Sequence, residues 1–482
     1  LVVTARLAHL SEWGSPAAPP REPPSRQSKH SPRKRSKNYA RGSCLIDSLF
    51  IVKRYSKTFT ATLTDTLRQQ LLQWAQQYDE VAWLDSNEHA QTHGTYSAIL
   101  AVDAFTALKT DADKAFEKLD EYQTITKDWL FGSLSYDLKN DVEVLTSKNT
   151  DGLEFPQLYF FQPKKVFLFS QTAVTLSYLN MVDDELQEDW DAILATHVTQ
   201  KTISKQPIQV LARTSKDSYL KKVATMLQHI KRGDIYEANF CQEFFSEGVA
   251  LDPTAAFWKL NELSTPPFAT FLKLEQQYVL SASPERYLKK EGTHIVSQPI
   301  KGTAKRAVSP KEDAALMLQL QQDPKERSEN IMITDLVRND LSRVAKKGTV
   351  TVQELCKIYT FAQVHQMIST IVCEVPESIR PVEIIKKTYP MGSMTGAPKV
   401  SAMKIIEKLE DARRGAYSGA VGYFTPSGDF DFNVVIRSIL YNAATQYVSF
   451  SVGGAITAKS IPEAEYQECL LKAKAMRQVL AQ

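Results

Sequence analysis

The chain has 482 residues, 43% of them hydrophobic and 23% charged, which is ordinary for a globular protein but too long for one domain of common size. No apolar stretch reaches the roughly 18 residues that a membrane-spanning helix needs. The five cysteines are scattered without CxxC or Cys/His spacing, so we expect reduced thiols in a cytoplasmic protein rather than a disulfide scaffold or a zinc site.

The first 43 residues differ from the rest. They hold six prolines and nine of the 58 basic residues but only two of the 55 acidic ones, a composition typical of an unfolded segment. Without them the net charge of +3 becomes about −4, so the body is not expected to bind nucleic acid. The basic run at 32–35 is either a targeting or nucleic-acid patch or, as we expect, part of a disordered extension.

The first half of the remaining chain begins with an amphipathic pattern that predicts a helix over 63–78. Strands are expected over 81–84 and 97–102, and the apolar alternation within 155–180 predicts a meander of strands. The acidic and polar stretch 184–207 is interpreted as a boundary. We therefore expect an extension over 1–43, an N-terminal region over 44–207 and a catalytic domain over 208–482.

The second half alternates runs of strands with helices. Periodicity and capping residues predict helices over 217–232, 253–263, from 310, over 324–337, 397–409 and from 462 onward. Apolar runs predict strands over 268–274, 278–283, 294–297, 364–375, 419–424, 430–441 and 447–452. Strands in runs separated by helices indicate an α+β fold.

Two pairs of glutamates have the spacing of one helix face. Glu326 and Glu329 are three residues apart on one predicted helix, and Glu465 and Glu468 are three residues apart on the last one. If the two helices face each other, their carboxylates form an all-oxygen site suited to Mg²⁺. The alternative is that these glutamates lie on solvated helix faces, which their spacing alone favours.

Two further residues could carry reaction chemistry. Lys301 follows a predicted strand and precedes Gly302 and Thr303, so its amine could act as a nucleophile beside backbone N–H groups that hold an anion. Glu285 follows a strand that ends on small residues, and a buried carboxyl group there could serve as a general acid. The alternative for Lys301 is an ordinary surface turn. The alternative for Glu285 is a structural ion pair with Arg286 or another arginine.

Several elements look suited to binding anions. The glycine-rich stretch around Thr395 leads into a helix, and Gly453, Gly454 and Ala455 follow a predicted strand and offer bare backbone N–H groups. Arg437 is a cation in an apolar strand and needs a carboxylate partner. His365 lies in a strand, where a lone histidine is more often a core residue. Together these elements predict a small substrate with more than one carboxylate.

The residues that carry these features also resemble a known family, the chorismate-utilising enzymes. The family includes anthranilate synthase component I, aminodeoxychorismate synthase component I and the isochorismate synthases. The similarity covers about 210–482, with the matching segments in the same order. The matching segments are 233–240 (GDIYEANF), 281–286, 299–303, 326–340 (ERSENIMITDLVRND), 392–399, 413–424 (RRGAYSGAVGYF) and 453–468. Many members of the family carry Gln where this chain has Glu237.

The resemblance implies a fold, a cofactor and a set of roles. It implies two antiparallel sheets packed face to face with helices outside, and Mg²⁺ held by Glu329 and Glu468 with Glu326 and Glu465 close by. It implies that Glu285 protonates the departing C4 hydroxyl of chorismate. It further implies that the chorismate carboxylates are held by Gly302, Thr303, Tyr417, Arg437 and the backbone of Gly453, Gly454 and Ala455. His365 and Thr395 match active-site positions of the family.

Lys301 distinguishes between the activities within the family. Anthranilate synthases typically have Ala at this position, which leaves C2 of the ring open to ammonia, whereas aminodeoxychorismate synthases often have Lys. A lysine amine can attack C2 as the C4 hydroxyl leaves, after which ammonia enters at C4 and expels the lysine. The amine must be neutral to attack, so we expect burial and nearby Mg²⁺ to lower the pKa of Lys301.

We therefore expect Mg²⁺-dependent amination of chorismate at C4. The alternatives are anthranilate synthase, isochorismate synthase and, from another class, a non-catalytic or nucleic-acid-binding relative. Cys241 has no glycine-rich elbow around it, so the chain contains no recognisable glutaminase. Ammonia is then expected from solution or from a separate glutamine amidotransferase subunit, with no nucleic-acid or membrane partner.

Overall fold

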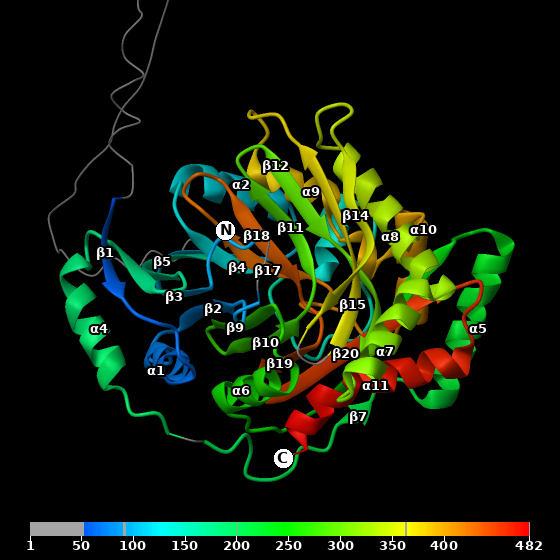
Figure 1. The fold of residues 1–482 in the computed structure, drawn as a ribbon, viewed down its shortest axis with the longest axis horizontal. Coiled ribbons are helices and arrows are strands. Elements are labelled where there is room, and N and C mark those ends of the chain that lie inside the picture. The colour runs from blue at the N-terminus through cyan, green and yellow to red at the C-terminus, as the bar shows by residue number, and fades with distance from the viewer. Residues whose placement is uncertain (1–52, 90–92, 200, 362–363, 482) are drawn as a thin grey trace, which may run out of the picture.

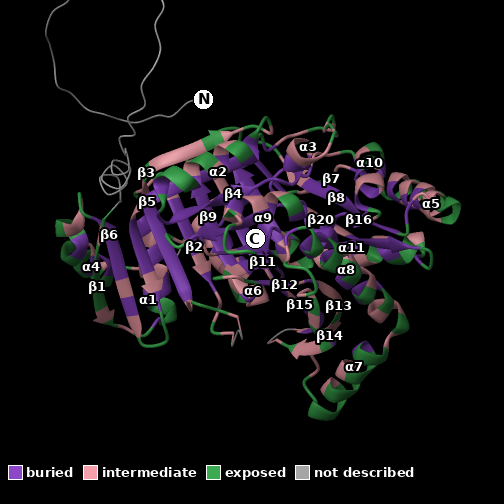
Figure 2. Cartoon of the chain, turned by 90° about the horizontal axis from the view of Figure 1, so that it is seen from above, coloured by how far each residue is buried: buried purple, intermediate pink, exposed green. Residues whose placement is uncertain are grey.

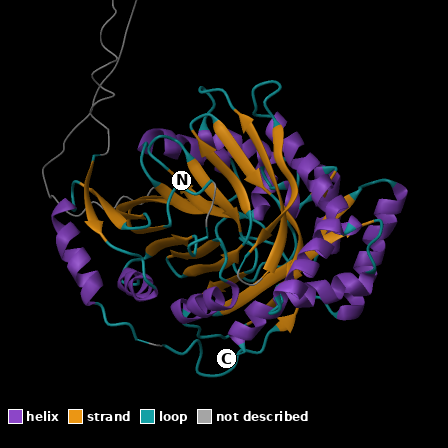
Figure 3. Ribbon diagram, viewed as in Figure 1, coloured by secondary structure: helices purple, strands orange, loops and turns teal. Residues whose placement is uncertain are grey.

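The structure is a computed structural model that describes residues 53–89, 93–199, 201–361 and 364–481. The extension expected over 1–43 lies outside the described residues. Strands occupy the centre of the molecule and helices surround them (Figure 3). The described strands form a single hydrogen-bonded network of antiparallel pairs, which divides into two branches that meet at β3 and β5.

The first branch runs from β1 to β8, with the short β7 and β16 also paired to β8. Its strands, in spatial order, are β1 (Arg54–Thr60), β6 (Ala173–Leu179), β5 (Leu158–Phe169), β3 (Ala98–Thr110), β2 (Glu80–Asp85), β9 (Phe268–Leu274), β10 (Gln277–Ser283), β19 (Ser438–Asn442), β20 (Tyr447–Thr457), β8 (Glu237–Ser246), and then β7 (Leu211–Ala212) and β16 (Gly396–Ala397).

The second branch starts at the other half of β5 and ends on β15, which carries two further strands on opposite edges. In spatial order its strands are β4 (Leu130–Leu134), β17 (Ala420–Phe424), β18 (Phe430–Val434), β11 (Arg286–Glu291), β12 (His294–Gln298), β15 (Val364–Glu374), and then β13 (Ile300–Lys305) and β14 (Thr351–Thr360).

The inner faces of the two branches share one hydrophobic core. Ala101 of β3 and Leu272 of β9 belong to the same buried cluster as Phe131 of β4, Leu288 of β11 and Phe432 of β18. Antiparallel sheets bury one face against a second layer in this way. The α+β fold with two sheets packed face to face, expected from the sequence, is therefore confirmed (Figure 1).

The helices cover the outer faces of both branches, and their exposed sides form much of the surface (Figure 2). A second buried cluster joins the first branch to α1, α4, α5, α6 and α11, whereas α2, α8 and α9 pack on the core between the branches. The helices are α1 (Asp65–Ala75), α2 (Ala115–Thr126), α3 (Lys139–Val142), α4 (Leu186–Ala195), α5 (Lys216–Arg232), α6 (Pro253–Ser264), α7 (Pro310–Gln322), α8 (Pro324–Ser342), α9 (Pro381–Thr388), α10 (Lys399–Leu409) and α11 (Pro462–Leu480), with short 3-10 turns η1 (Tyr136–Leu138), η2 (Asp183–Glu185) and η3 (Gly392–Met394).

Two predicted strands have different bounds in the structure. The strand expected over 430–441 is broken into β18 and β19, because the chain turns at Arg437, whose φ is +54°. The strand expected over 447–452 continues to Thr457, since β8 pairs with it along its whole length. Gly453, Gly454 and Ala455 therefore lie inside β20 and do not follow it.

The boundary expected near residue 207 does not interrupt the sheet. Strand β2 pairs with β9, and β4 pairs with β17, so strands from the two sides of the boundary alternate within each branch. The boundary stretch itself contains α4. The regions 44–207 and 208–482 thus share their cores and their hydrogen bonds. Among the described residues, no helix has both the length and the apolar character needed to cross a membrane.

Candidate active site

The candidate site lies where the free ends of the two branches approach each other, with β8, β20 and α11 on one side and β13 and α8 on the other (Figure 2). Helix α8 packs on β13, β14 and β15, and α11 packs on β20. Each helix thereby brings its pair of glutamates toward Lys301, whose pKa responds to carboxylates from both helices.

Lys301 is held on β13 with its amine among acidic groups. Its side chain is 14% exposed, and its Nζ lies 4.0 Å from Glu237 Oε1 of β8. Its backbone carbonyl accepts a 3.4 Å hydrogen bond from Asn330 Nδ2 of α8, which ties the strand to the helix. This position lets the amine reach into the space between the two branches.

The pKa of Lys301 departs from the expectation. Burial lowers it, but Glu237, Glu329, Glu285 and Glu468 raise it more, and the net result is a pKa above the ordinary lysine value. The amine is therefore a cation in the protein alone, because four carboxylates stabilise its charge. The expected lowering by burial is outweighed, so an attack by this amine first requires the loss of a proton.

Glu285 lies in the turn between β10 and β11 and is 4% exposed. Its backbone carbonyl accepts a hydrogen bond from Val434 N, which fixes the turn against β18. Burial raises the pKa of Glu285 to about 7, against the opposing effects of a hydrogen bond from Ser393 and the charge of Lys301. A carboxyl group with this pKa is half protonated near neutral pH, as a general acid must be.

Three of the four predicted metal-site glutamates gather around a lysine. Lys325 Nζ lies 3.3 Å from Glu465 Oε1, 3.8 Å from Glu329 Oε1 and 4.0 Å from Glu468 Oε2. Burial also raises the pKa of Glu329 to about 7, with Lys301 and Lys325 opposing this effect. Both helix pairs therefore face each other as the sequence predicts, and a cation already lies between them.

The positions of these glutamates fit a metal site only in part. Within the described part of the chain, no three His, Cys, Asp or Glu side chains are close enough together to hold a metal as they stand. However, Glu329 Oε1 is buried without a hydrogen-bond partner, and all the donors are carboxylate oxygens. Lys325 is 37% exposed, so its ammonium can move to solvent and leave a position that suits a hard divalent cation.

Arg437 is the clearest anion-binding group in the site. It stands between β18 and β19, and its side chain makes no hydrogen bond or ion pair with the residues that the structure describes. Burial lowers its pKa, while Tyr417 and Glu468 act in the opposite direction. A half-buried guanidinium group with no ion pair among the described residues is well placed to bind an anion.

Backbone groups lie near these side chains. Beyond Ser449, one edge of β20 has no partner strand among the described residues, so part of the backbone of Gly453, Gly454 and Ala455 remains available. Lys472 of α11 binds the Gly453 carbonyl at 2.9 Å and Glu468 Oε1 at 2.7 Å, which fixes α11 on β20.

The other predicted residues have varied positions. Gly302 has φ +93° and brings β13 close to Glu326, whereas the side chain of Thr303 is exposed. Thr395 is fully buried, and its hydroxyl donates to backbone carbonyls of its own loop. Tyr417 is buried with its hydroxyl 3.6 Å from Cys241 Sγ.

His365 lies on β15, opposite Ala304 of β13. Its Nε2 is 3.0 Å from Asp313 Oδ1 of α7, and its Nδ1 is 2.9 Å from Thr360 Oγ1 of β14. Both ring nitrogens are therefore occupied by the protein. In this conformation the imidazole is a buried structural group, as expected for a lone histidine in a strand.

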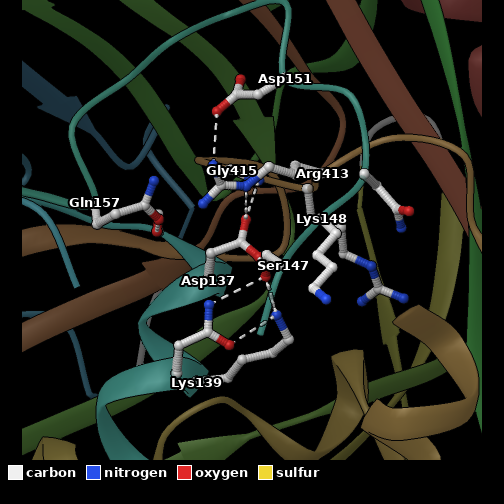
Figure 4. A network of polar contacts seen from close by, with 12 residues as sticks. Asp137, Lys139, Ser147, Lys148, Asp151, Gln157, Arg413 and Gly415 are labelled. Atoms are coloured by element: carbon white, nitrogen blue, oxygen red, sulfur yellow. Dashed lines mark hydrogen bonds and ion pairs between the residues drawn. The ribbon is translucent and has the colours of Figure 1, made fainter. Parts of the chain in front are cut away.

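Two buried networks hold the loop that carries Tyr417. Arg414 pairs with Glu410 at 2.7 Å and donates to the carbonyls of Met394 and Asn239 at 2.6 and 2.7 Å, joining η3 and β8. Figure 4 shows the second network, in which Asp137 binds Lys139 at 3.0 Å and the backbone N of Gly415 at 3.0 Å. The N-terminal region thus positions a loop of the site.

Four participants have contacts that are not among those predicted from the sequence. Lys325 stands four residues before Glu329, and Lys472 stands four residues after Glu468. This i,i+4 spacing on a predicted helix is a signal that indicates both contacts. Ser393 lies in the predicted glycine-rich loop, but its hydrogen bond to Glu285 depends on contacts between distant segments. Glu237 was noted only as a difference from relatives.

Comparison with known proteins assigns the family. The sequence signature of the chorismate binding enzyme family covers residues 61–478. This chain belongs to the chorismate binding enzymes. Aminodeoxychorismate synthase component 1 of Bacillus subtilis strain 168 is 31% identical over 360 residues, which is 72% of this chain and 76% of that protein. The protein of the same name from Escherichia coli strain K12 is 40% identical over 254 residues, or 53% of this chain and 55% of that protein.

Some curated relatives are longer, and the chain spans about half of their length or less, for example 46% of the aminodeoxychorismate synthase of Streptomyces griseus. Among solved structures, anthranilate synthase component I from Streptococcus pneumoniae superposes with a TM-score of 0.70 at 23% identity, over 81% of this chain and 94% of that chain. MenF, an isochorismate synthase from Escherichia coli, gives 0.69 at 16% identity, over 91% and 98%. These structural similarities establish the fold.

Proposed function

We propose that this chorismate binding enzyme aminates chorismate at C4 to give 4-amino-4-deoxychorismate, a precursor of 4-aminobenzoate and folate. The observation that carries the proposal is Lys301, a buried amine that shares its surroundings with the half-protonated Glu285. The names of several relatives at 31–40% identity support the same activity. An alanine at position 301, as in typical anthranilate synthases, would leave no nucleophile at this place.

In this proposal Lys301 attacks C2 of the ring while Glu285 protonates the departing C4 hydroxyl, which leaves as water. Ammonia then forms a bond to C4 and the lysine amine is expelled from C2. Arg437 supplies a positive charge for a substrate carboxylate, and Tyr417 and the open edge of β20 lie close to it. Burial of these groups strengthens their electrostatic effect on the substrate.

We also propose that Mg²⁺ is the cofactor, with Glu329 and Glu468 as ligands and Glu326 and Glu465 close by. When bound, the cation would neutralise a substrate carboxylate and stabilise charge in the site. One oxygen of Glu329 is buried without a hydrogen-bond partner, and burial and Glu468 raise the pKa of Glu326. Both observations indicate that an additional positive charge would stabilise these carboxylates. Lys325 would have to leave this position before the metal enters.

The source of ammonia is proposed to be a separate glutamine amidotransferase subunit. A glutaminase of the cysteine type needs an accessible thiolate. All four cysteines in the described part of the chain are buried, and burial raises the pKa of Cys241 to about 12. The words "component 1" in the names of relatives also support a partner.

Product identity tests the proposal. The purified chain is incubated with chorismate, Mg²⁺ and an ammonium salt at alkaline pH, and the products are separated by chromatography and mass spectrometry. We expect 4-amino-4-deoxychorismate with ammonium and no product with glutamine alone. Anthranilate as the main product would instead assign C2 amination, and isochorismate formed without ammonia would assign the addition of water.

A further inference from the structure

Glu237 is a buried carboxylate whose charge is incompletely satisfied. It is the first residue of β8 and is 1% exposed. Both of its carboxylate oxygens are buried without a hydrogen-bond partner among the residues that the structure describes. Such a group is costly to bury as an anion, and it stays ionised only if a positive charge or a proton is close at hand.

Lys301 is the cation that acts on Glu237, and the carboxyl groups of Glu237 and Glu329 also influence each other. Lys301 Nζ is 4.0 Å from Glu237 Oε1, and this is the only ion pair of Lys301 within the described residues. Burial raises the pKa of Glu237, and the charge of Lys301 opposes this effect. The other carboxylates that influence the lysine, Glu329, Glu285 and Glu468, are committed to the cation site or to the hydroxyl leaving group.

The backbone holds Glu237 rigidly at this distance. Glu237 pairs with Thr457 of β20 on one side and with Ala397 of β16 on the other. The preceding residue, Tyr236, donates its backbone N–H to the Ala397 carbonyl at 2.7 Å. A carboxylate fixed between two strands changes its distance to Lys301 only through its own side chain.

From this arrangement, and on the basis of the proposed function, we infer that Glu237 is a catalytic residue that takes a proton from Lys301 and later returns it. The N–H bond of the ammonium breaks and an O–H bond forms on Glu237, which leaves a neutral amine. The lone pair of the amine forms the bond to C2, and the C4–O bond breaks as the hydroxyl takes the proton of Glu285. When ammonia bonds to C4 and the amine is expelled, Glu237 gives its proton back to Lys301.

The transfer is internal to the pair and therefore does not depend on the proton concentration of the solvent. If Glu237 is replaced by Gln, the proton of Lys301 must go to water. As long as the pH is below the pKa of the lysine, the fraction of neutral amine then increases about tenfold for each unit by which the pH is raised. A residue that only packs against Lys301 would change the rate by the same factor at every pH.

The experiment measures how fast Lys301 forms its adduct with chorismate and Mg²⁺ in the absence of ammonia. Reactions are quenched at intervals and analysed by intact-protein mass spectrometry from about pH 7 to pH 9. At pH 7 we expect E237Q to be slower than the wild type by about 100-fold or more. The ratio of the E237Q rate to the wild-type rate should rise about tenfold per pH unit, and this ratio cancels the titration of Glu285, which both proteins share.

Two further variants sharpen the test. E237D keeps a carboxylate, so it should be slower than the wild type but should keep the wild-type pH dependence. E247Q removes an exposed glutamate just beyond β8 and should form the adduct at the wild-type rate. A rate ratio for E237Q that is constant with pH, or an E237Q rate equal to that of the wild type, would overturn the role of Glu237. An absence of adduct in the wild type would instead overturn the covalent step of the proposed function itself.

Discussion

In the proposed function, Lys301 is the residue on which the choice between C4 and C2 amination depends. Replacing it with Ala removes the nucleophile, so formation of 4-amino-4-deoxychorismate should fall by about 100-fold or more. The shorter side chain also opens C2, and a trace of C2-aminated product is expected. Product chromatography after incubation with chorismate, Mg²⁺ and ammonium measures both effects.

Lys301→Arg is the matched control for this change, because it keeps the positive charge but cannot lose its proton and attack. It should be as inactive as Lys301→Ala in C4 amination. If either variant makes 4-amino-4-deoxychorismate at the wild-type rate, Lys301 is only an electrostatic or packing residue, and the proposal of C4 amination loses its main support.

Glu285 should set the alkaline limb of the activity profile. Its pKa is raised from the model-compound value of 4.5 to about 7, so the carboxyl group is protonated below that pH and ionised above it. Because the general acid must carry a proton, kcat should fall about tenfold per pH unit above about pH 7. The measurement uses saturating chorismate and a constant concentration of free ammonia at every pH.

The variant Glu285→Gln separates this effect from other titrations. It has no proton to give, so activity should be low at all pH values and the limb near pH 7 should disappear. A limb that persists in Glu285→Gln would belong to another group. Ser393→Ala should move the limb to higher pH, since the hydrogen bond from Ser393 lowers the pKa of Glu285.

At the scale of elements, α8 and α11 are held together through Lys325, which lies among their glutamates. If Mg²⁺ binds among these glutamates as proposed, Lys325→Met removes a competing cation, so half-maximal activity should require several-fold less Mg²⁺. Without metal the variant should unfold at a lower temperature than the wild type, because Glu329, Glu465 and Glu468 then repel one another. Magnesium titration of activity and thermal unfolding with and without Mg²⁺ measure these effects.

Lys474→Met serves as the control, since it removes an exposed lysine of α11 that forms no ion pair with these glutamates among the described residues. It should leave the Mg²⁺ requirement unchanged. A higher Mg²⁺ requirement in Lys325→Met would mean that Lys325 supports the metal-bound state and does not compete with it.

The network in Figure 4 should contribute stability as well as position. Asp137→Asn removes the nearer and more deeply buried of the two carboxylates beside the Lys139 ammonium and leaves only Glu407 at 3.6 Å, which should cost about 3 kcal/mol in the free energy of unfolding. The control Asp151→Asn removes a longer and more exposed pair with Arg413 and should cost less than about 1 kcal/mol. Denaturant unfolding monitored by circular dichroism compares the two, and equal losses would contradict the assignment of Asp137 as the central anion.

At the scale of the whole molecule, the shared sheet predicts that 208–482 is not an independent domain. A protein that begins at residue 208 lacks β2 and β4, so β9 and β17 each lose a partner strand and their apolar faces are exposed. We expect it to lack cooperative thermal unfolding and to consume no chorismate. Co-expression with 44–207 should restore both properties. A cooperatively folded, active 208–482 fragment would contradict this view of the sheet.

The same scale shows what the sequence could and could not predict. Segments with strong apolar alternation, such as β9 and β17, and well-capped helices, such as α6, were predicted nearly to the residue. β13 was not predicted, since its sequence IKGTAK has little apolar pattern and its strand geometry comes from pairing with β15. In the site, the spacing of Glu326 and Glu329 predicts that they share a helix face. The contact between Glu237 and Lys301 is not predictable in this way, because these residues are 64 positions apart in the sequence and approach each other only when β8 and β13 are in place.

The position of α11 in the chain has a consequence for biosynthesis. Every described strand is complete at Thr457, whereas Glu465 and Glu468 belong to the helix that follows. A polypeptide shortened to residue 461 keeps every described strand but lacks two of the three carboxylates that lie within 4.0 Å of Lys325. It would also expose the apolar surface that α11 covers, so quality control could recognise such a product by its uncovered core.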